Sequence, residues 1–393
     1  MPPFVVQASR LHDSTAIEEV RAGRPHHNIT RVEWWVSTMP CEGNTMTIDM
    51  KQGLDWQPPD SWHRIQTIDA HTGGEPLRVI LSGYPELEAS TILERRRSAQ
   101  KHHDALRTAL MWEPRGHADM YGCLIVPPET ESSDFGILFL HNEGYSTMCG
   151  HGIIAVTTVL LETGMLPVTG PETEVRIDTP AGLVVARGQV ENGRVTRVTF
   201  TNVPSFVLLA NQTVEVPGLG TVRYDVAFGG AFYAFVDAAE VGVTLGPESF
   251  QQLIDKGMAI KRAVMAAGGI THPFEKDLSF LYGTIFTGVP LSDGADSRHV
   301  CVFAEGEVDR SPTGTGVSAR AAIHRARNEL EVGEGMVIES IIGSRFTVRV
   351  LEDTEFGPFP AVIPEVGGSA SITGRQEFLI DPEDPLRDGF ILR

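Results

Sequence analysis

Short runs of apolar residues, bounded by Gly, Pro or Asp, fill most of the chain after residue 60 and predict a β-rich fold. In the first half, the predicted strands cover residues 63–70, 77–83, 121–128, 135–144, 174–180, 181–188 and 194–204. Between the fourth and fifth of these strands lies the stretch "CGHGIIAVTTVLLETG" (149–164). Its apolar residues no longer follow the two-residue period of a strand, and it ends at a glycine. It therefore predicts a helix that begins near Cys149.

The second half repeats this order. A β-type run containing a Gly-Gly pair comes first, then a helix, two further strands and a second helix that begins in a glycine-rich turn. The predicted ranges are 223–237 (strand), 249–268 (helix), 279–288 and 298–309 (strands), and 313–330 (helix). Strands predicted at 336–343, 345–353 and 360–380 close the chain.

The halves also align residue by residue. Asp69, Gly73 and Gly74 correspond to Asp225, Gly229 and Gly230 at an offset of 156. The segment 137–155 corresponds to 301–319 at an offset of 164, which superposes Phe139 on Phe303, Glu143 on Glu307 and Ala155 on Ala319. We therefore expect two matched α/β domains with the active groups in the cleft between them.

The predicted organisation has three parts. Residues 1–60 read as an N-terminal extension without evident chemistry, and residues 61–206 form the first α/β domain. A stretch punctuated by Pro and Gly at 204–220 indicates the boundary, after which residues 207–361 form the second domain.

The composition narrows the classes of partner. The chain has 32 basic and 51 acidic residues, a formal charge of −19, which disfavours nucleic acid and anionic membrane surfaces. No apolar run reaches the roughly 20 residues of a membrane span, and no secretory signal is evident. The four cysteines (41, 123, 149 and 301) lie far apart, so neither a metal site nor a disulfide framework is predicted. A reducing cytoplasm is the expected compartment.

Two glycine-rich turns carry the candidate chemistry. Cys149-Gly150-His151-Gly152 corresponds to Thr313-Gly314-Thr315-Gly316, and each turn leads from a β-run into a helix. Backbone N–H groups and the dipole at a helix start suit an anion such as a carboxylate. The same position is expected to lower the pKa of Cys149 and to make it a base or nucleophile.

Other interpretations of these residues were weighed. Cys41, Cys123 and Cys301 are expected in the core, and Asp309 can simply begin a turn with Pro312. Both turns fit the pattern G-x-G-x-x-A of dinucleotide-binding loops, but several residues separate each preceding strand from the first glycine, and no ribose-binding acid follows. We therefore prefer the interpretation that the two turns bind a carboxylate group, and rank binding of a nucleotide cofactor well below it.

The two motifs resemble the signatures of the proline racemase family, cofactor-independent enzymes that act at the α-carbon of proline and hydroxyprolines. "MCGHGIIA" matches the first motif, and "DRSPTGTGVSA" matches the second except at one position. The resemblance extends from "IDAHTGGEPLRVI" to "DPEDPLRDGF" and covers nearly everything after residue 64. It implies two similar domains, each a curved, mostly antiparallel sheet around a central helix, with residues 362–393 returning to the first domain.

The resemblance also implies residue roles. Racemases of the family carry a cysteine in both motifs, one on each face of the substrate, whereas this chain has Thr313 at the second position. A threonine hydroxyl is too weakly acidic for a two-thiol racemisation. The Cys149/Thr313 pair resembles the branch that dehydrates trans-3-hydroxy-L-proline. In that branch Cys149 would remove the α-proton, and either Cys149 or Thr313 would assist departure of the 3-hydroxyl as water.

The binding roles follow by the same matching. Gly150, His151, Gly314 and Thr315 would hold the substrate carboxylate, and Asp309 the ring nitrogen. The expected ligand is a small hydroxyproline, and no cofactor, metal, nucleic acid or membrane is expected. The sequence does not reveal the assembly, so a homodimer is an open expectation. The alternatives are a racemase or epimerase of proline or 4-hydroxyproline, and a non-catalytic protein that binds imino acids.

Overall fold

The computed structural model describes residues 48–392. Most of the predicted N-terminal extension, and with it Cys41, lies outside the described residues. Residues 48–57 belong to a unit of their own, in which the side chain of Asp49 caps a short helix, α1 (Met50–Asp55), by accepting the Lys51 N–H at 2.9 Å. The unit that begins at Pro58 contains all the features described below.

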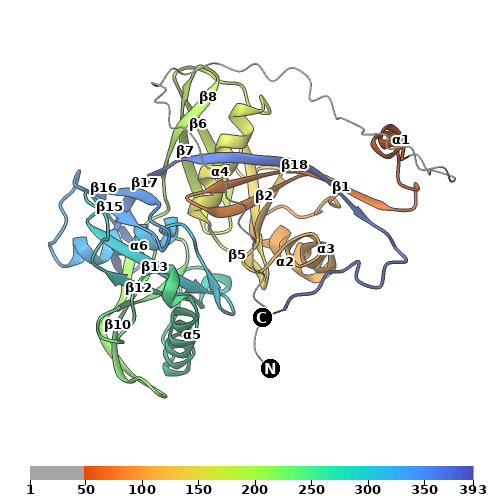
Figure 1. The fold of residues 1–393 in the computed structure, drawn as a ribbon. Helices are drawn as coiled ribbons and strands as arrows, with labels where there is room; N and C mark the ends of the chain where they lie inside the picture. Colours follow the sequence, from red (N-terminus) through yellow and green to blue (C-terminus); the bar gives the residue numbers. More distant parts are fainter. Residues whose placement is uncertain (1–47, 393) are drawn as a thin grey trace, which may run out of the picture. The chain divides into compact units, whose positions relative to one another are not determined.

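The first half of that unit is a curved sheet in which most strands pair with the next strand along the chain (Figure 1). Its strands are β1 (His63–Thr72), β2 (Glu75–Ser82), β3 (Tyr121–Val126), β4 (Phe135–His141), β5 (Gly144–Ser146), β6 (Glu172–Thr179), β7 (Gly182–Glu191) and β8 (Arg194–Thr201). The β2–β3 and β4–β6 pairs are parallel and the others antiparallel. The last strand of the chain, β18 (Ala370–Ile380), lies antiparallel beside β1, so the chain returns to its first half.

Helix α4 (Gly150–Glu162) lies inside this sheet. Residues 150–161 are all buried, because the sequence is apolar around nearly the whole helix and cannot present a polar face to water. The helix contacts β1, β2, β7, β8, β17 and β18. Two further helices, α2 (Ile92–His102) and α3 (Asp104–Met111), pack against β4, and α2 begins with a Thr91/Glu94 capping box.

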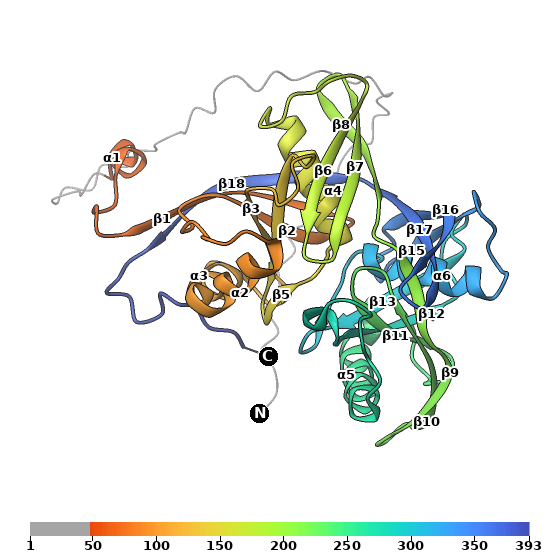
Figure 2. The same ribbon diagram turned by 180° about the vertical axis from the view of Figure 1, so that it is seen from behind.

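The second half has the same plan, which is clearest from behind (Figure 2). Its strands are β9 (Ser205–Val216), β10 (Gly220–Phe228), β11 (Phe232–Asp237), β12 (Leu281–Gly288), β13 (Ser297–Phe303), β14 (Glu307–Val308), β15 (Gly335–Glu339), β16 (Arg345–Phe356) and β17 (Phe359–Gly368). The central helix is α6 (Gly314–Ala326), which contacts β9, β10, β11, β16 and β17. Helix α5 (Phe250–Ala267) packs on the sheet against β9, β12 and β13, and the 3₁₀ turns are η1 (Pro247–Ser249) and η2 (Lys276–Leu278).

Strand pairing reveals the internal repeat directly. The β1–β2 hairpin corresponds to β10–β11, and the parallel pairs β2–β3 and β4–β6 correspond to β11–β12 and β13–β15. The predicted fold of two similar halves, each a sheet around a central helix, is therefore confirmed. Strand β17 pairs with β16 and β9 and also with β8, so backbone hydrogen bonds join the halves. The domain boundaries at residues 206 and 361 stay predictions.

Some local structure was not predicted. Residues 204–220, interpreted as a boundary, contain the strand β9, whose polar segment "ANQT" pairs antiparallel with β10. The predicted strand 360–380 is two strands that separate after Gly368 and pair with different neighbours. Helices α2 and α3 had no sequence assignment, because α2 is highly charged and shows little apolar periodicity.

The N-terminal ends of the two central helices meet at a pair of glycines. A Cβ atom added to Gly314 would lie 2.6 Å from the Cα of Gly150, and one added to Gly150 would lie 2.5 Å from the Cα of Gly314. Such distances are far below van der Waals contact, and the obstructing atoms are backbone. The glycines therefore let α4 and α6 approach closely enough to share one site.

Replacing Gly314 with alanine should force the two helix ends apart. We expect Gly314→Ala to lower the free energy of unfolding by about 1–3 kcal/mol, the usual cost of overpacking a filled interior. Urea denaturation followed by circular dichroism measures this change. Gly170→Ala is a matched control, because its nearest neighbour atom would lie at an ordinary 3.7 Å. Equal stability of the two variants would contradict the steric argument.

Candidate active site

A small pocket lies where the two helix ends meet. Every residue proposed for the site from the sequence lines it, namely Cys149, Gly150, His151, Asp309, Thr313, Gly314 and Thr315. The remaining lining residues are Tyr121, Met148, Tyr233, Tyr282, Cys301 and Phe303. The structure thus brings together two motifs that are 164 residues apart.

Cys149 is the N-cap residue of α4. Its Sγ accepts the N–H of Gly152 at 3.3 Å, in the manner of a capping side chain, and the residue is only 5% exposed. The Sγ also lies 3.2 Å from Nδ1 of His151. The thiol is therefore held at the helix start by one backbone donor and one imidazole.

The contacts of His151 determine how its ring is protonated. Its Nε2 lies 3.3 Å from the carbonyl oxygen of Pro76, which can only accept, so Nε2 is assigned the hydrogen. Nδ1 is then an acceptor for the S–H of Cys149. Burial lowers the pKa of His151 to about 3, which keeps the imidazole neutral at physiological pH.

The expectation of a lowered thiol pKa was wrong. Burial is the largest influence and raises the pKa of Cys149 well above its ordinary value, and the nearby Asp309 and Glu75 carboxyl groups act in the same direction. The N–H of Gly152 lowers the pKa but does not offset burial. The sequence identified the helix N-terminus but contained no measure of how completely the surrounding structure excludes water.

Thr313 occupies the equivalent place at the start of α6. Its backbone has φ 68°, which is uncommon for a β-branched residue and indicates local strain. Its N–H donates to Oγ of Ser311 at 3.1 Å, whose own N–H donates to Oδ1 of Asp309 at 2.7 Å. The Oγ1 of Thr313 is buried and makes no hydrogen bond of ordinary geometry among the described residues. It lies close enough to the Asp309 and Cys301 side chains to lower the pKa of both groups. A hydroxyl held so weakly at the wall of a pocket is available to a ligand.

Asp309 is a buried carboxyl group at the wall of the pocket. Burial raises its pKa to about 6, while hydrogen bonds from Ser311 and the nearby hydroxyl of Thr313 act in the opposite direction. At neutral pH the group is therefore mostly ionised, and a cation in the pocket would stabilise it further. Together with the N–H groups at two helix starts, the pocket offers sites for both a carboxylate and an amine.

Aromatic side chains complete the pocket and were not predicted. The hydroxyl of Tyr121 lies 2.5 Å from Oγ of Ser146 and 3.2 Å from the hydroxyl of Tyr282, which comes from the other half. The ring of Tyr121 meets that of His151 edge to face at 4.8 Å between centroids. Cys301, expected in the core, is fully buried as predicted but also lines the pocket. No local pattern in the sequence distinguishes these residues from ordinary core residues.

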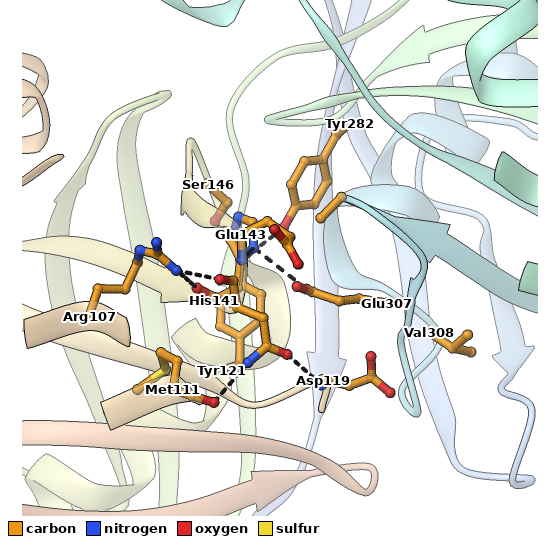
Figure 3. A network of polar contacts seen from close by, with 12 residues as sticks. Arg107, Met111, Asp119, Tyr121, His141, Glu143, Ser146, Tyr282, Glu307 and Val308 are labelled. Atoms are coloured by element: carbon orange, nitrogen blue, oxygen red, sulfur yellow. Dashed lines mark hydrogen bonds and ion pairs between the residues drawn. The ribbon is translucent and has the colours of Figure 1, made fainter. Parts of the chain in front are cut away.

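A polar network beside the pocket joins the two halves (Figure 3). His141, at the end of β4, lies with its Nδ1 3.5 Å from Oε2 of Glu307 in β14, and both side chains are buried. Arg107 of α3 donates to the carbonyl oxygen of His141 at 2.9 Å. The network fixes β4 and β14 relative to each other, and these strands lead into the two motif loops.

Two further findings concern the part of the chain from residue 48 to 392. It contains no group of three or more His, Cys, Asp or Glu residues arranged to hold a metal ion. None of its helices is long and apolar enough to cross a membrane.

The raised thiol pKa can be measured directly. We expect thiolate absorbance in the ultraviolet difference spectrum, wild type minus Cys149→Ser, to appear only above the pH range in which an exposed cysteine ionises. The difference removes the contributions of the other cysteines. A difference signal that is complete near neutral pH would show that the helix N-terminus outweighs burial.

Comparisons with known proteins agree with these observations. Residues 67–391 match the sequence model of the proline racemase family. The chain is 48% identical to a trans-3-hydroxy-L-proline dehydratase of Colwellia psychrerythraea, over 86% of this chain and 96% of the relative. It is 44% identical to a 3-hydroxyproline 2-epimerase of Burkholderia multivorans, over 84% of this chain and 98% of the relative.

A solved structure is also similar. It is that of a hydroxyproline epimerase from Agrobacterium vitis with bound trans-4-hydroxy-L-proline, which is 34% identical and superposes with a TM-score of 0.81. The match covers 85% of this chain and 96% of that one. The paired helix ends, the two motifs and these similarities over most of the chain lead to one conclusion: the protein belongs to the proline racemase family.

Proposed function

We propose that the protein dehydrates trans-3-hydroxy-L-proline to Δ1-pyrroline-2-carboxylate. The observation that carries this proposal is the pairing of one thiol, Cys149, with one hydroxyl, Thr313, at equivalent helix starts in the same pocket. Further relatives, 45% and 47% identical over most of the chain, are also named trans-3-hydroxy-L-proline dehydratase.

The substrate carboxylate is assigned to the two helix ends. Gly150, His151, Gly314 and Thr315 are the first residues of α4 and α6, and their N–H groups have no helical acceptor of their own. The hydroxyl of Thr315 is held by that of Tyr233 at 2.7 Å, so its orientation is fixed. Two helix dipoles directed at one carboxylate also stabilise charge that develops there when the α-carbon loses its proton.

The ring nitrogen is assigned to Asp309. Proline-type amines are cationic at neutral pH, and Asp309 is the carboxyl group of the pocket lining. Placing the carboxylate at the helix ends and the amine at Asp309 fixes the ring at two points. This attachment at two points orients the α-hydrogen toward one of the two motifs, and such orientation of the reacting groups accelerates the reaction.

Cys149 is assigned as the base. Its raised pKa makes the thiolate scarcer at neutral pH but also more basic, which suits removal of a weakly acidic α-proton. The N–H of Gly152 stabilises the thiolate when it forms. His151 remains neutral and holds the sulfur in place rather than taking the proton.

Elimination of water then requires catalytic groups on only one face of the substrate ring. In the trans isomer the 3-hydroxyl is opposite the carboxylate and so shares a ring face with the α-hydrogen. The electrons of the Cα–H bond form the Cα=Cβ bond, the C–O bond breaks, and the thiol formed at Cys149 returns the proton to the departing hydroxyl as water. The enamine product, Δ2-pyrroline-2-carboxylate, tautomerises to the Δ1 imine.

The alternative function is epimerisation at the α-carbon, which is in the names of two similar proteins. Epimerisation requires a second acid on the opposite face of the ring. Thr313 occupies the position that a second thiol would take, and a threonine hydroxyl is too weakly acidic to protonate the α-carbon as a thiol does near neutral pH. The pair Cys149/Thr313 therefore favours dehydration.

The location and assembly remain predictions. A cytoplasmic location rests on the sparse cysteines, of which Cys123, Cys149 and Cys301 are free thiols in the structure. A homodimer is likewise a prediction, and size-exclusion chromatography with light scattering tests it.

The function is tested by turnover. Purified wild-type protein incubated with trans-3-hydroxy-L-proline should form Δ1-pyrroline-2-carboxylate, detected by its reaction with an aromatic aldehyde. Cys149→Ser should lower kcat by at least about a hundredfold, since it removes the proton acceptor, while its circular dichroism spectrum stays unchanged. Absence of product from the wild type, or full activity of Cys149→Ser, would contradict the proposal.

Restoring a second thiol should change the reaction. We expect Thr313→Cys to produce cis-3-hydroxy-D-proline, the α-epimer, because a thiol then faces each side of the ring. Chiral chromatography measures the epimer, and Thr313→Ser is the control because it keeps a hydroxyl. Equal epimer formation by the wild type and Thr313→Cys would show that Thr313 does not set the outcome.

A further inference from the structure

The turn between β1 and β2 places a buried glutamate behind the proposed amine site. Glu75 is the first residue of β2, pairs with Thr72 across the turn and is fully buried. Its Oε2 accepts the N–H of Arg310 at 2.8 Å. Arg310 directly follows Asp309, so the side chain of Glu75 reaches the same loop that carries the carboxyl group of the pocket.

The same turn supports the first motif. Thr72 donates through Oγ1 to the carbonyl oxygen of His151 at 2.9 Å, and the carbonyl of Pro76 faces Nε2 of His151. Gly74 has φ 93°, and a Cβ there would lie 2.4 Å from Ile342. The turn therefore packs against residues of both motif loops, which holds Glu75 near Asp309.

The adjacent arginine offsets the negative charge of Glu75 only in part. The guanidinium of Arg310 donates through Nη1 to Asp119 at 2.6 Å and to the carbonyl of Val308 at 2.7 Å. Oε1 of Glu75 is buried and has no hydrogen-bond partner among the residues that the structure describes. A buried carboxylate with one unsatisfied oxygen is costly, so the group has reason to keep its proton.

We propose that Glu75 is a positioning residue that keeps its proton beside Asp309 and releases it to solvent when a cationic ring amine binds at Asp309. The inference rests on the proposed placement of the ring nitrogen at Asp309. In this step the O–H bond of Glu75 breaks, its proton passes to buffer, and the ammonium group of the ligand is shared between the carboxylates of Asp309 and Glu75.

The electrostatic surroundings agree with this geometry. Burial raises the pKa of Glu75 well above its ordinary value, and Asp309 raises it further. Arg310 lowers the pKa and Asp119 raises it, while the thiols Cys149 and Cys301 lie within electrostatic range. An added cation would act against burial and Asp309, and would therefore favour ionisation of Glu75.

Calorimetry in the inactive Cys149→Ser background tests the inference, because trans-3-hydroxy-L-proline binds there without turnover. Titration near neutral pH in two buffers of different ionisation enthalpy counts the protons released on binding. We expect close to one proton with Glu75 intact and almost none after Glu75→Gln, together with about tenfold weaker binding. Pyrrole-2-carboxylate, whose nitrogen is not basic, should bind both proteins equally and release no proton.

The variants separate this role from a structural one. The amide introduced by Glu75→Gln keeps an acceptor for the Arg310 N–H and resembles the protonated acid, so a structural role alone predicts unchanged binding and proton count. Glu75→Asp should restore part of the proton release, and Glu86→Gln, at an exposed glutamate, should change nothing. Equal proton release with and without Glu75 would overturn the inference. Failure of the wild type to dehydrate the substrate would contradict the proposed function but leave the proton count interpretable.

Discussion

The contact between Gly150 and Gly314 is the constraint on which the site depends. Each central helix lies within its own curved sheet, and the two helices meet at their N-terminal ends. Because neither glycine has a Cβ, the backbones approach to a distance that no other residue pair would permit. The free N–H groups of both helices then face one small pocket. The internal repeat of a sheet around a helix thus brings two helix starts to one pocket, where we propose that they bind an anionic group of the ligand.

The protonation states of the pocket groups depend on two opposing influences, burial and the fixed dipoles of the helix starts. Burial raises the pKa of Cys149 and Asp309 and lowers that of His151, so each group is pushed toward its neutral form. In the proposed binding mode, a zwitterionic ligand would reverse part of this, since its carboxylate would meet two helix N-termini and its amine a carboxyl group. The substrate itself would thus supply the groups that complete the charge pattern. In this arrangement the pocket groups would reach their reactive charge states only when the substrate is bound correctly. The proposed loss of a proton from Glu75 would couple one more group, behind the pocket wall, to substrate binding.

Much of the site could be predicted from the sequence, because its chemistry is concentrated in two glycine-rich turns. Cys149 and Thr313 stood out since the glycines and the start of an apolar helix follow them directly. The internal repeat could be recognised in the sequence because the two glycine-rich turns align with each other. The structure shows the corresponding strand pairs in both halves. The pKa of Cys149 was predicted with the wrong sign, since the number of atoms that exclude water from a thiol is a property of the tertiary structure. Tyr121, Tyr282 and Glu75 were missed because each looks like an ordinary strand residue until the halves are brought together.

The central claim is that the reaction proceeds on one face of the ring, with a single base. It is tested most directly by stopping the wild-type reaction part-way in D₂O and analysing the recovered substrate. The account predicts that no deuterated cis-3-hydroxy-D-proline accumulates, and that any deuterium at the α-carbon is found in trans-3-hydroxy-L-proline with its configuration retained. Accumulation of the deuterated D-epimer at a rate comparable with that of water loss would contradict it, because a second acid would then have to act from the opposite face.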